Sequence, residues 1–308
     1  IQSETLVALG PLLDLADPYA IAKAGERCNL LGIDTISTGV TIAFAMECYE
    51  RGAIDDSAAG FPIRWGDASA VLRLIEMIGK REGFGEVLAR GVRSASEHIG
   101  KGSEAWAMHV RGLEVPMHDP RGKKGMGLAY ATAMKGADHE SSMHDEAFQR
   151  ENAMPALGFT EPISRFEMKG KPKLVKALQE YWGTLADCLP VCKFPLIPPR
   201  PFNPERVLAA LNFVTGWDMS MDEYLMCGER VFNLGRVMNL REGKSPGEDR
   251  LPKRFGDPIP EGGSQGQTLP EELLTSALLE YYALRGWSPE GIPTAETLRR
   301  LGIDGMVD

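Results

Sequence analysis

The 308-residue sequence is poor in several features that define common protein classes. Its five cysteines are too few and too irregularly spaced for a secreted disulfide framework, so we expect a reducing, cytoplasmic environment. No run approaches the ~20 apolar residues that a membrane-spanning helix needs, so no membrane partner is expected. Basic residues are also scarce, because 34 of them against 43 acidic residues give a net charge of −9. That balance argues against nucleic acid as a partner.

The sequence also lacks an initiator methionine and a signal peptide, since it opens directly with Ile1. We therefore expect the chain to be cut from a longer protein. Its composition of 43% hydrophobic and 25% charged residues is that of a globular protein and excludes disorder. A chain of this length has enough material for two domains.

Helical periodicity dominates the first hundred residues. Helices with capping residues at their ends are predicted at residues 17–32, 37–52, from 67 onward and across 87–92. Between Ala105 and Val115 apolar residues recur with a period of two, which predicts a short strand or an extended connector. We place the boundary between two helical domains there, with domains at residues 1–108 and 109–308.

The second half of the sequence continues the mainly α pattern, with more loops. Further helices are predicted from residue 128, at 173–185, 204–214, 222–240 and 270–284. In the helix at 222–240 the stripe Val231, Leu234 and Met238 is expected to be buried. Glycine and proline predict loops at 119–127, 195–204 and 243–266, and a turn at 293–301.

The segment Asn29-Leu30-Leu31-Gly32-Ile33-Asp34 lies between two predicted helices and ends on a carboxylate. Asp34 has two interpretations that the sequence leaves open. It can cap the following helix by accepting its free N–H groups. It can also accept a hydrogen bond from an amino or ring N–H group of a ligand.

A second segment, Asp187-Cys188-Leu189-Pro190-Val191-Cys192, follows a predicted helix at a point where proline prevents another from starting. Cysteines on such irregular turns are plausible metal ligands, although a partly buried cysteine more often packs as a small hydrophobe. That second interpretation is stronger for Cys28, Cys48 and Cys227. Among the histidines, His139 follows a stretch of small residues that would let the backbone approach a cofactor.

Several segments taken together resemble the aldehyde ferredoxin oxidoreductase family of tungsten or molybdenum pterin enzymes. They occur in family order and cover nearly the whole chain. The segments are residues 28–39, 111–116, 119–122, 130–132, 136–139, 187–192, 228–230, 233–234, 239–243, 281–287 and 290–294. The resemblance implies the two helical domains, 2 and 3, of that family, without its N-terminal pterin-binding β domain.

The resemblance also implies cofactor ligands. Each helical half of the family offers a motif Asp-x-x-Gly-Leu-Cys/Asp to a pterin. Here the first motif departs from the pattern at Asn29 and the second at Pro190. The positions carried over as cofactor-binding are Asn29, Gly32, Ile33, Asp34, Asp187, Val191 and Cys192. Cys192 matches one of the four cysteines of the family's [4Fe–4S] cluster, and the other three are expected in a Cys-x-x-Cys-x-x-x-Cys run upstream of Glu4.

For the chemistry, the resemblance places Glu4 and His139 near the metal. The implied reaction is oxidation of a small aldehyde to a carboxylic acid at a tungsto- or molybdopterin centre, with electrons passing through the cluster to ferredoxin. A glutamate can then serve as base, and a histidine can donate a hydrogen bond to a substrate oxygen. The fragment alone is expected to be inactive, and the sequence leaves a homo-oligomer open.

Two alternatives stay open beside this enzyme hypothesis. A relative within the family could act on an aromatic acyl thioester instead of an aldehyde. A different class of protein, a helical scaffold or partner module, could have kept the fold and lost the cofactors. The joint presence of Glu4, Asp34, His139 and Cys192 favours the enzyme, whereas Asn29 and Pro190 favour the scaffold.

Overall fold

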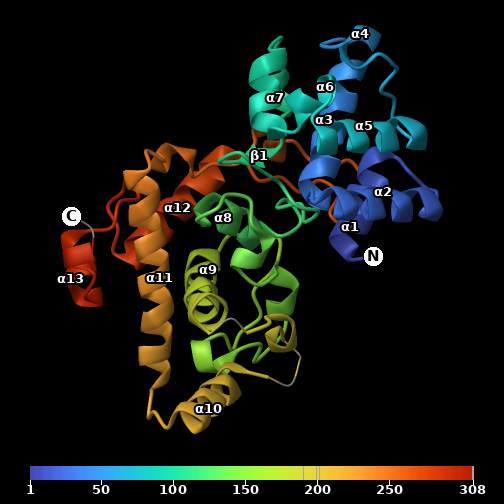
Figure 1. Ribbon diagram of the computed structural model, residues 1–308. Coiled ribbons are helices and arrows are strands. Elements are labelled where there is room, and N and C mark those ends of the chain that lie inside the picture. The colour runs from blue at the N-terminus through green and yellow to red at the C-terminus, as the bar shows by residue number, and fades with distance from the viewer. Residues whose placement is uncertain (190, 199, 201, 307–308) are drawn as a thin grey trace. The chain divides into compact units, whose positions relative to one another are not determined.

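The computed structural model describes residues 1–189, 191–198, 200 and 202–306, and these form two compact units (Figure 1). The first unit comprises Ile1–His118, Lys135–Asp138 and Pro252–Arg254, and the second comprises Asp119–Met134, His139–Leu251 and Phe255–Asp308. The division into domains 1–108 and 109–308 stays a prediction. The expected mainly α class is confirmed, because the only named strands in the described part form one short hairpin.

The first unit is a bundle of short helices around one apolar core. Its helices are α1 Ser3–Ala8, α2 Pro18–Leu31, α3 Thr35–Glu50, α4 Asp56–Ala59, α5 Ala68–Lys80, α6 Phe84–Leu88 and α7 Gly91–Ile99, with 3-10 turns at Pro11–Leu13 and Ser103–Trp106. The caps at Asp17 and Asp67 are confirmed: the Asp17 side chain accepts from the Tyr19 N–H group, and Asp67 accepts from Ser69 and Ala70. The helix predicted at 37–52 instead begins at Thr35 and ends at Glu50. Helix α3 runs through the core, with every residue from Thr38 to Met46 buried.

The single helix predicted across residues 87–92 is wrong, because two helices meet there. Helix α6 ends at Leu88, and Gly91, the first residue of α7, has a φ of +81°, a left-handed conformation that interrupts the helical backbone. The side chain of Glu114 then accepts a hydrogen bond of 2.8 Å from the N–H group of Val92, in the first turn of α7. Glu114 belongs to the antiparallel hairpin of β1, His109–Val110, and β2, Leu113–Glu114. The extended segment predicted at 105–115 is therefore confirmed in part, because it contains two short strands and its first two residues lie in the 3-10 turn Ser103–Trp106.

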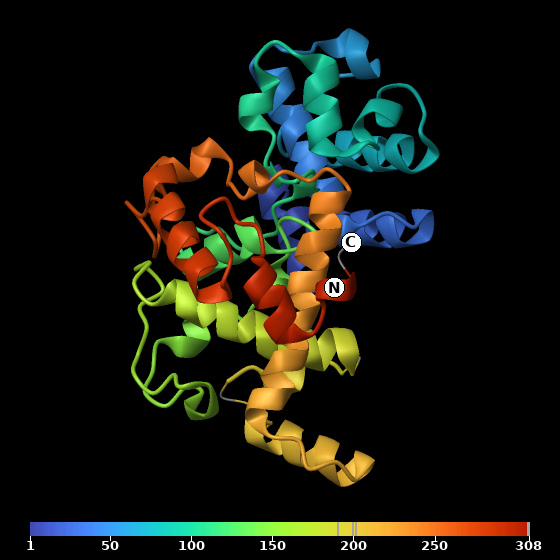
Figure 2. The same cartoon turned by 90° about the vertical axis from the view of Figure 1, so that its left-hand side faces the viewer.

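The second unit contains longer helices joined by longer loops. Its helices are α8 Lys124–Thr132, α9 Lys171–Trp182, α10 Pro204–Thr215, α11 Met221–Arg241, α12 Glu271–Arg285 and α13 Ala295–Leu301. The 3-10 turns of this unit are His139–Ser141, Asp145–Phe148, Pro155–Leu157, Phe194–Leu196, Pro246–Glu248 and Asp304–Met306, and a further turn, Lys253–Gly256, begins in the first unit and ends in the second. Both views show α10 at one end of the long helix α11 (Figures 1 and 2). The predicted turn at 293–301 contains a helix, α13, capped by Thr294.

The apolar stripe expected on α11 is wrong, since Met238 is 63% exposed and Val231 and Leu234 are only half-buried. The buried face instead carries polar residues, among them Glu229 and Asn233. Arg300 of α13 pairs with Glu229, and Asn233 accepts a hydrogen bond from Trp287 and donates one to the Glu229 carbonyl, so both buried side chains have partners. A pattern of hydrophobicity alone cannot identify such a face.

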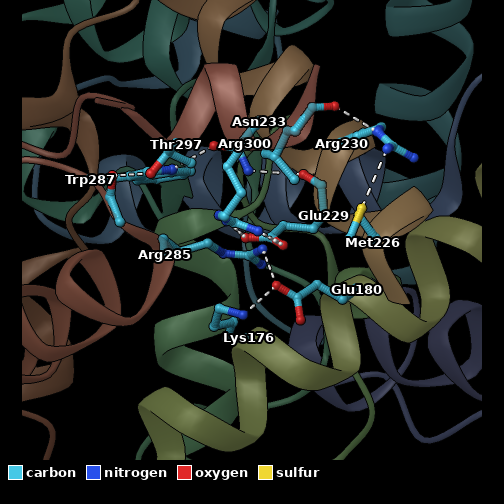
Figure 3. Close-up of polar contacts among 12 residues, drawn as sticks. Lys176, Glu180, Met226, Glu229, Arg230, Asn233, Arg285, Trp287, Thr297 and Arg300 are labelled. Carbon is cyan, nitrogen blue, oxygen red and sulfur yellow. Dashed lines mark hydrogen bonds and ion pairs between the residues drawn. The ribbon is translucent and has the colours of Figure 1, made fainter. Parts of the chain in front are cut away.

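Charged residues from four helices form the polar network in the second unit (Figure 3). Arg285, which is fully buried, donates to Glu180 at 3.0 Å and to Gln179 at 2.8 Å, and Lys176 pairs with the same Glu180 at 2.6 Å. Arg300 of α13 binds both carboxylate oxygens of Glu229, at 2.6 and 3.0 Å. These contacts tie α12 to α9 and α13 to α11.

Among the residues described, no single helix is long and apolar enough to span a membrane. The segments Ser3–Leu13 and Pro18–Leu31 reach that length and hydropathy only when taken together, across a bend of 120°.

Candidate functional site

The carboxylate of Glu4 is held by two consecutive residues of the segment after the hairpin. Glu4 lies in the first turn of α1 and is 9% exposed. Its Oε2 accepts a hydrogen bond of 2.9 Å from the backbone N–H group of Met117, and its Oε1 lies 2.7 Å from Nε2 of His118. One donor therefore faces each carboxylate oxygen, which gives this buried acid a defined orientation.

Helix α1 reaches this position through a close approach to α3. A Cβ atom on Gly39 of α3 would lie 2.7 Å from the carbonyl carbon of Ala8 and 2.9 Å from its Cβ atom, so only glycine permits this crossing. The hydroxyl groups of Thr5 and Thr35 share a hydrogen bond of 2.8 Å beside it. The structure thus brings the helix of Glu4 next to the first residue of α3, which follows Asp34.

The segment 29–34 comprises the last three residues of α2 and the connection from Gly32 to Asp34 that leads into α3. Gly32 has a φ of +69° and open space around its α-carbon, so its conformation and not crowding requires glycine. Asp34 caps α3, because its Oδ2 accepts a hydrogen bond of 2.7 Å from the N–H group of Ser37. Asn29, Gly32 and Asp34 are exposed and Ile33 is half-buried. The capping interpretation of Asp34 is confirmed, and its exposure also leaves it accessible to a ligand.

Asp187 and Cys188 were expected on an irregular turn after a helix, and this expectation is wrong. Helix α9 passes directly into a π-helical turn, Gly183–Cys188, in which the N–H group of Leu189 donates to the carbonyl of Thr184 at 3.2 Å. Such π-helical turns are often found at functional sites. Pro190 lies outside the described residues. Val191 and Cys192 follow it as exposed, non-helical residues.

The five thiols differ sharply in environment. Cys28 and Cys48 are fully buried, as the helical pattern predicts, and burial raises the pKa of their thiols to about 11 and about 12. Cys227 is half-buried. Burial and the nearby Cys227 and Asp187 also raise the pKa of the exposed Cys188 above its ordinary value. Cys192 combines exposure with an irregular backbone, which suits a cluster ligand.

His139 lies in the second unit, in the 3-10 turn His139–Ser141, with 19% of its side chain exposed. Its ring stands edge-on to that of His144, with 6.3 Å between the centroids, and Nδ1 of His144 lies 3.1 Å from Nζ of Lys123. Lys193 links this turn to the segment of Cys192, because its Nζ donates to the carbonyl oxygen of Glu140 at 2.5 Å. Within the second unit, the structure therefore joins two segments that the sequence identified separately.

Two residues that contact candidate site segments, one in each unit, were missed by sequence reasoning. His118 stands between two of the segments that resemble the family, but nothing in its local pattern indicates a partner at Glu4. Lys193 directly follows Cys192, and its ammonium group also lies 4.7 Å from the ring centroid of Trp182. Its position beside a candidate ligand is the one signal that could have identified it.

Comparison with known proteins places this arrangement in a family. The sequence model described as aldehyde ferredoxin oxidoreductase, domains 2 & 3, matches residues 2–303. The chain belongs to the aldehyde ferredoxin oxidoreductase family. The tungsten-containing aldehyde ferredoxin oxidoreductase of Pyrococcus furiosus is 37% identical over 97% of this chain and 48% of its own length. The enzyme of the same name from Thermococcus kodakarensis is 35% identical over the same shares. This aldehyde ferredoxin oxidoreductase family chain thus spans about half the length of these relatives.

Two further proteins that this chain resembles have names that differ from aldehyde ferredoxin oxidoreductase. The aliphatic sulfonate oxidoreductase, WOR-like subunit, of Pyrococcus furiosus is 29% identical over 96% of this chain and 44% of its own length. Among solved structures, a chain of the active site complex BamBC of benzoyl coenzyme A reductase superposes with a TM-score of 0.76. That alignment covers all of this chain and 50% of the other at 23% identity, and so shows a shared fold.

The exposed residues of both units fit the family's cofactors. Asp34 uses Oδ2 for its cap, so a pterin N–H group can approach its other oxygen without disrupting α3. Cys192 offers one accessible thiol, and a [4Fe–4S] cluster takes four. Two of the other four cysteines, Cys28 and Cys48, are fully buried and unsuited to bind a cluster. The cysteines of this chain therefore cannot supply all four thiolates.

Proposed function

We propose that this chain is the C-terminal half of an oxidoreductase that converts small aldehydes to carboxylic acids. The observation that carries the proposal is the match of the family model for domains 2 & 3 over residues 2–303. In agreement with it, the chain covers 48% of the length of the tungsten-containing relative from Pyrococcus furiosus. Oxidation of an aldehyde with water gives a carboxylic acid, two protons and two electrons. When bound, the tungsto- or molybdopterin takes up the two electrons, and a [4Fe–4S] cluster relays them singly to ferredoxin.

In this proposal some residues of the chain bind the cofactors, and others move a proton and bind the substrate oxygen. Asn29, Gly32, Ile33 and Asp34 contact one pterin, with Asp34 accepting from its N–H groups. Asp187 and Val191 contact the second pterin, and Cys192 supplies one thiolate to the cluster. The other three thiolates would come from the part of the protein that this chain does not include.

Glu4 and His139 carry the proposed proton and hydrogen-bond chemistry. The carboxylate of Glu4 takes a proton from water or the hydrated aldehyde, which its burial and fixed orientation support. His139 donates a hydrogen bond to the substrate oxygen, which stabilises the charge that develops there. The partial exposure of His139 leaves its ring accessible from solvent.

The test uses the full-length protein, expressed anaerobically with tungstate and molybdate. We expect tungsten or molybdenum and about four irons per chain, as one cubane cluster requires. We also expect aldehyde-dependent reduction of ferredoxin. Activity confined to aromatic acyl thioesters would select that alternative substrate. A protein with neither metal nor iron would support the helical scaffold.

Variants of the two exposed cysteines sharpen the test of the cluster. C192A should lose most of the iron and the absorbance of the cluster, because a thiolate ligand is missing. C188A is the matched control, since Cys188 is also exposed and lies four residues away. Equal iron content in both variants would contradict the role proposed for Cys192.

A further inference from the structure

The Glu4 carboxylate is held in a way that the family assignment does not require. Met117 and His118 are adjacent in the chain, yet each faces a different oxygen of Glu4, at 2.9 and 2.7 Å. The first contact comes from the backbone and does not depend on the identity of residue 117. The second depends entirely on the side chain of residue 118.

This contact constrains the imidazole as well as the carboxylate. A carboxylate oxygen 2.7 Å from Nε2 is an acceptor, so Nε2 carries the proton and donates it to Oε1 of Glu4. Only 11% of the Glu4 side chain and 22% of the His118 side chain are exposed, so water competes little for this hydrogen bond.

We propose that His118 is the positioning residue for Glu4, and that its Nε2–H group fixes the plane of the carboxylate that serves as base. This inference rests on the proposed function, in which Glu4 removes the proton. Without the His118 contact, Oε1 of Glu4 would lose the donor that fixes the plane of the carboxylate, and the carboxylate could rotate about its hydrogen bond with the Met117 N–H group. A base displaced in this way meets its proton in productive geometry less often.

A purely structural role makes a different prediction. If the pair merely ties α1 to the segment after the hairpin, losing it lowers thermal stability and leaves kcat unchanged. If His118 positions the base, losing its N–H group lowers kcat while KM for the aldehyde stays the same. The two roles are therefore separated by kinetics and not by stability.

The experiment compares three variants of the full-length, metal-loaded protein. H118F keeps an aromatic ring and removes the donor, whereas H118Q keeps an N–H group at a similar reach. H98F is the matched control, because His98 is exposed in the last turn of α7. We expect kcat of H118F to fall about 10- to 100-fold with KM within about twofold, as for other residues that orient a reacting group. H118Q should recover most of this loss, and H98F should match the parent.

Crystal structures of the same variants give a readout that is independent of activity. In H118Q the Glu4 carboxylate should keep its orientation, with residue 118 in hydrogen-bond distance, and in H118F it should rotate. The proposal is overturned if H118F retains the carboxylate orientation and the kcat of H98F, or if H118Q loses as much activity as H118F. Full activity of E4Q would instead refute the role of Glu4 in the proposed function, and the crystal structures would still test the pair.

Discussion

Replacing Gly228 with alanine should destabilise the second unit more than adding one methyl group at any other position of α11. A Cβ atom at this position would overlap the carbonyl oxygen of Glu180 and would lie 2.6 Å from its carbonyl carbon and 2.9 Å from its Cα atom. All three atoms belong to the backbone of α9, so no side-chain rotation relieves the overlap. Gly228 also lies against Gly183, the first residue of the π-helical turn.

The magnitude follows from the separation that the methyl group imposes. To reach ordinary van der Waals distance from the Glu180 carbonyl oxygen, α9 and α11 must move apart by about 1.5 Å, which forfeits about half or more of the dispersion energy of the contacting atoms. Overpacking of this kind costs roughly 3–4 kcal/mol at the upper end, while alanine regains ~1 kcal/mol of helix propensity. The net loss in G228A is therefore about 2–3 kcal/mol, or a melting temperature lower by about 5–10 °C.

The matched control is G235A on the same helix. There the added Cβ atom would meet the side chain of Met134, lying 2.9 Å from its Cγ atom, and a methionine side chain can move aside. The free energy of unfolding should change by less than about 1 kcal/mol, because the strain and the gain in propensity nearly cancel. Thermal unfolding by circular dichroism measures both variants. A melting temperature of G228A within about 2 °C of the parent, or no lower than that of G235A, would refute the reasoning.

Three further predictions concern single groups. D34A removes the cap of α3 and should lower the free energy of unfolding by about 1 kcal/mol. D34S can still cap the helix and should restore stability but not pterin content. Melting curves and cofactor analysis of the full-length protein measure the two effects. Burial alone would raise the pKa of Glu229, but its hydrogen bonds with Arg300 hold the pKa below the ordinary value. The stability that Glu229 contributes should therefore be present above a pH of about 4.5 and be lost as pH falls through the folded pKa. In R300M, urea titrations should show that the free energy of unfolding depends less on pH over this range. Iodoacetamide at neutral pH should alkylate the exposed Cys192 rapidly. Cys48 should react only after unfolding, because burial raises the pKa of its thiol to about 12. Equal alkylation rates of the two cysteines, measured by mass spectrometry, would contradict this.

The sequence determined the helices whose signals are local. Asp17, Asp67 and Gly32 identify helix ends because each makes its capping hydrogen bonds with residues within four positions. The segments that resemble the family are equally readable, since each is a short run of residues in a fixed order. The fold class and the family were therefore accessible without coordinates.

The failures have a common physical cause, which is that the deciding contact is distant in sequence. The helix predicted across residues 87–92 is divided at Gly91, and the Val92 N–H group finds its acceptor on Glu114. The buried face of α11 is polar because Arg300 neutralises Glu229 from a helix 71 residues further along. Hydrophobic periodicity treats such a residue as solvent-facing, since the compensating charge is not in the same window.

The candidate site shows the same division. The sequence by itself identified Glu4, through its place in a resembling chain, and identified Asp34 and Cys192 through their motifs. Only the tertiary structure decided that Glu4 is buried and that Met117, 113 residues away, and His118 orient it. A motif records which side chain is present, whereas the orientation of a carboxylate depends on donors that the fold brings to it from elsewhere in the chain.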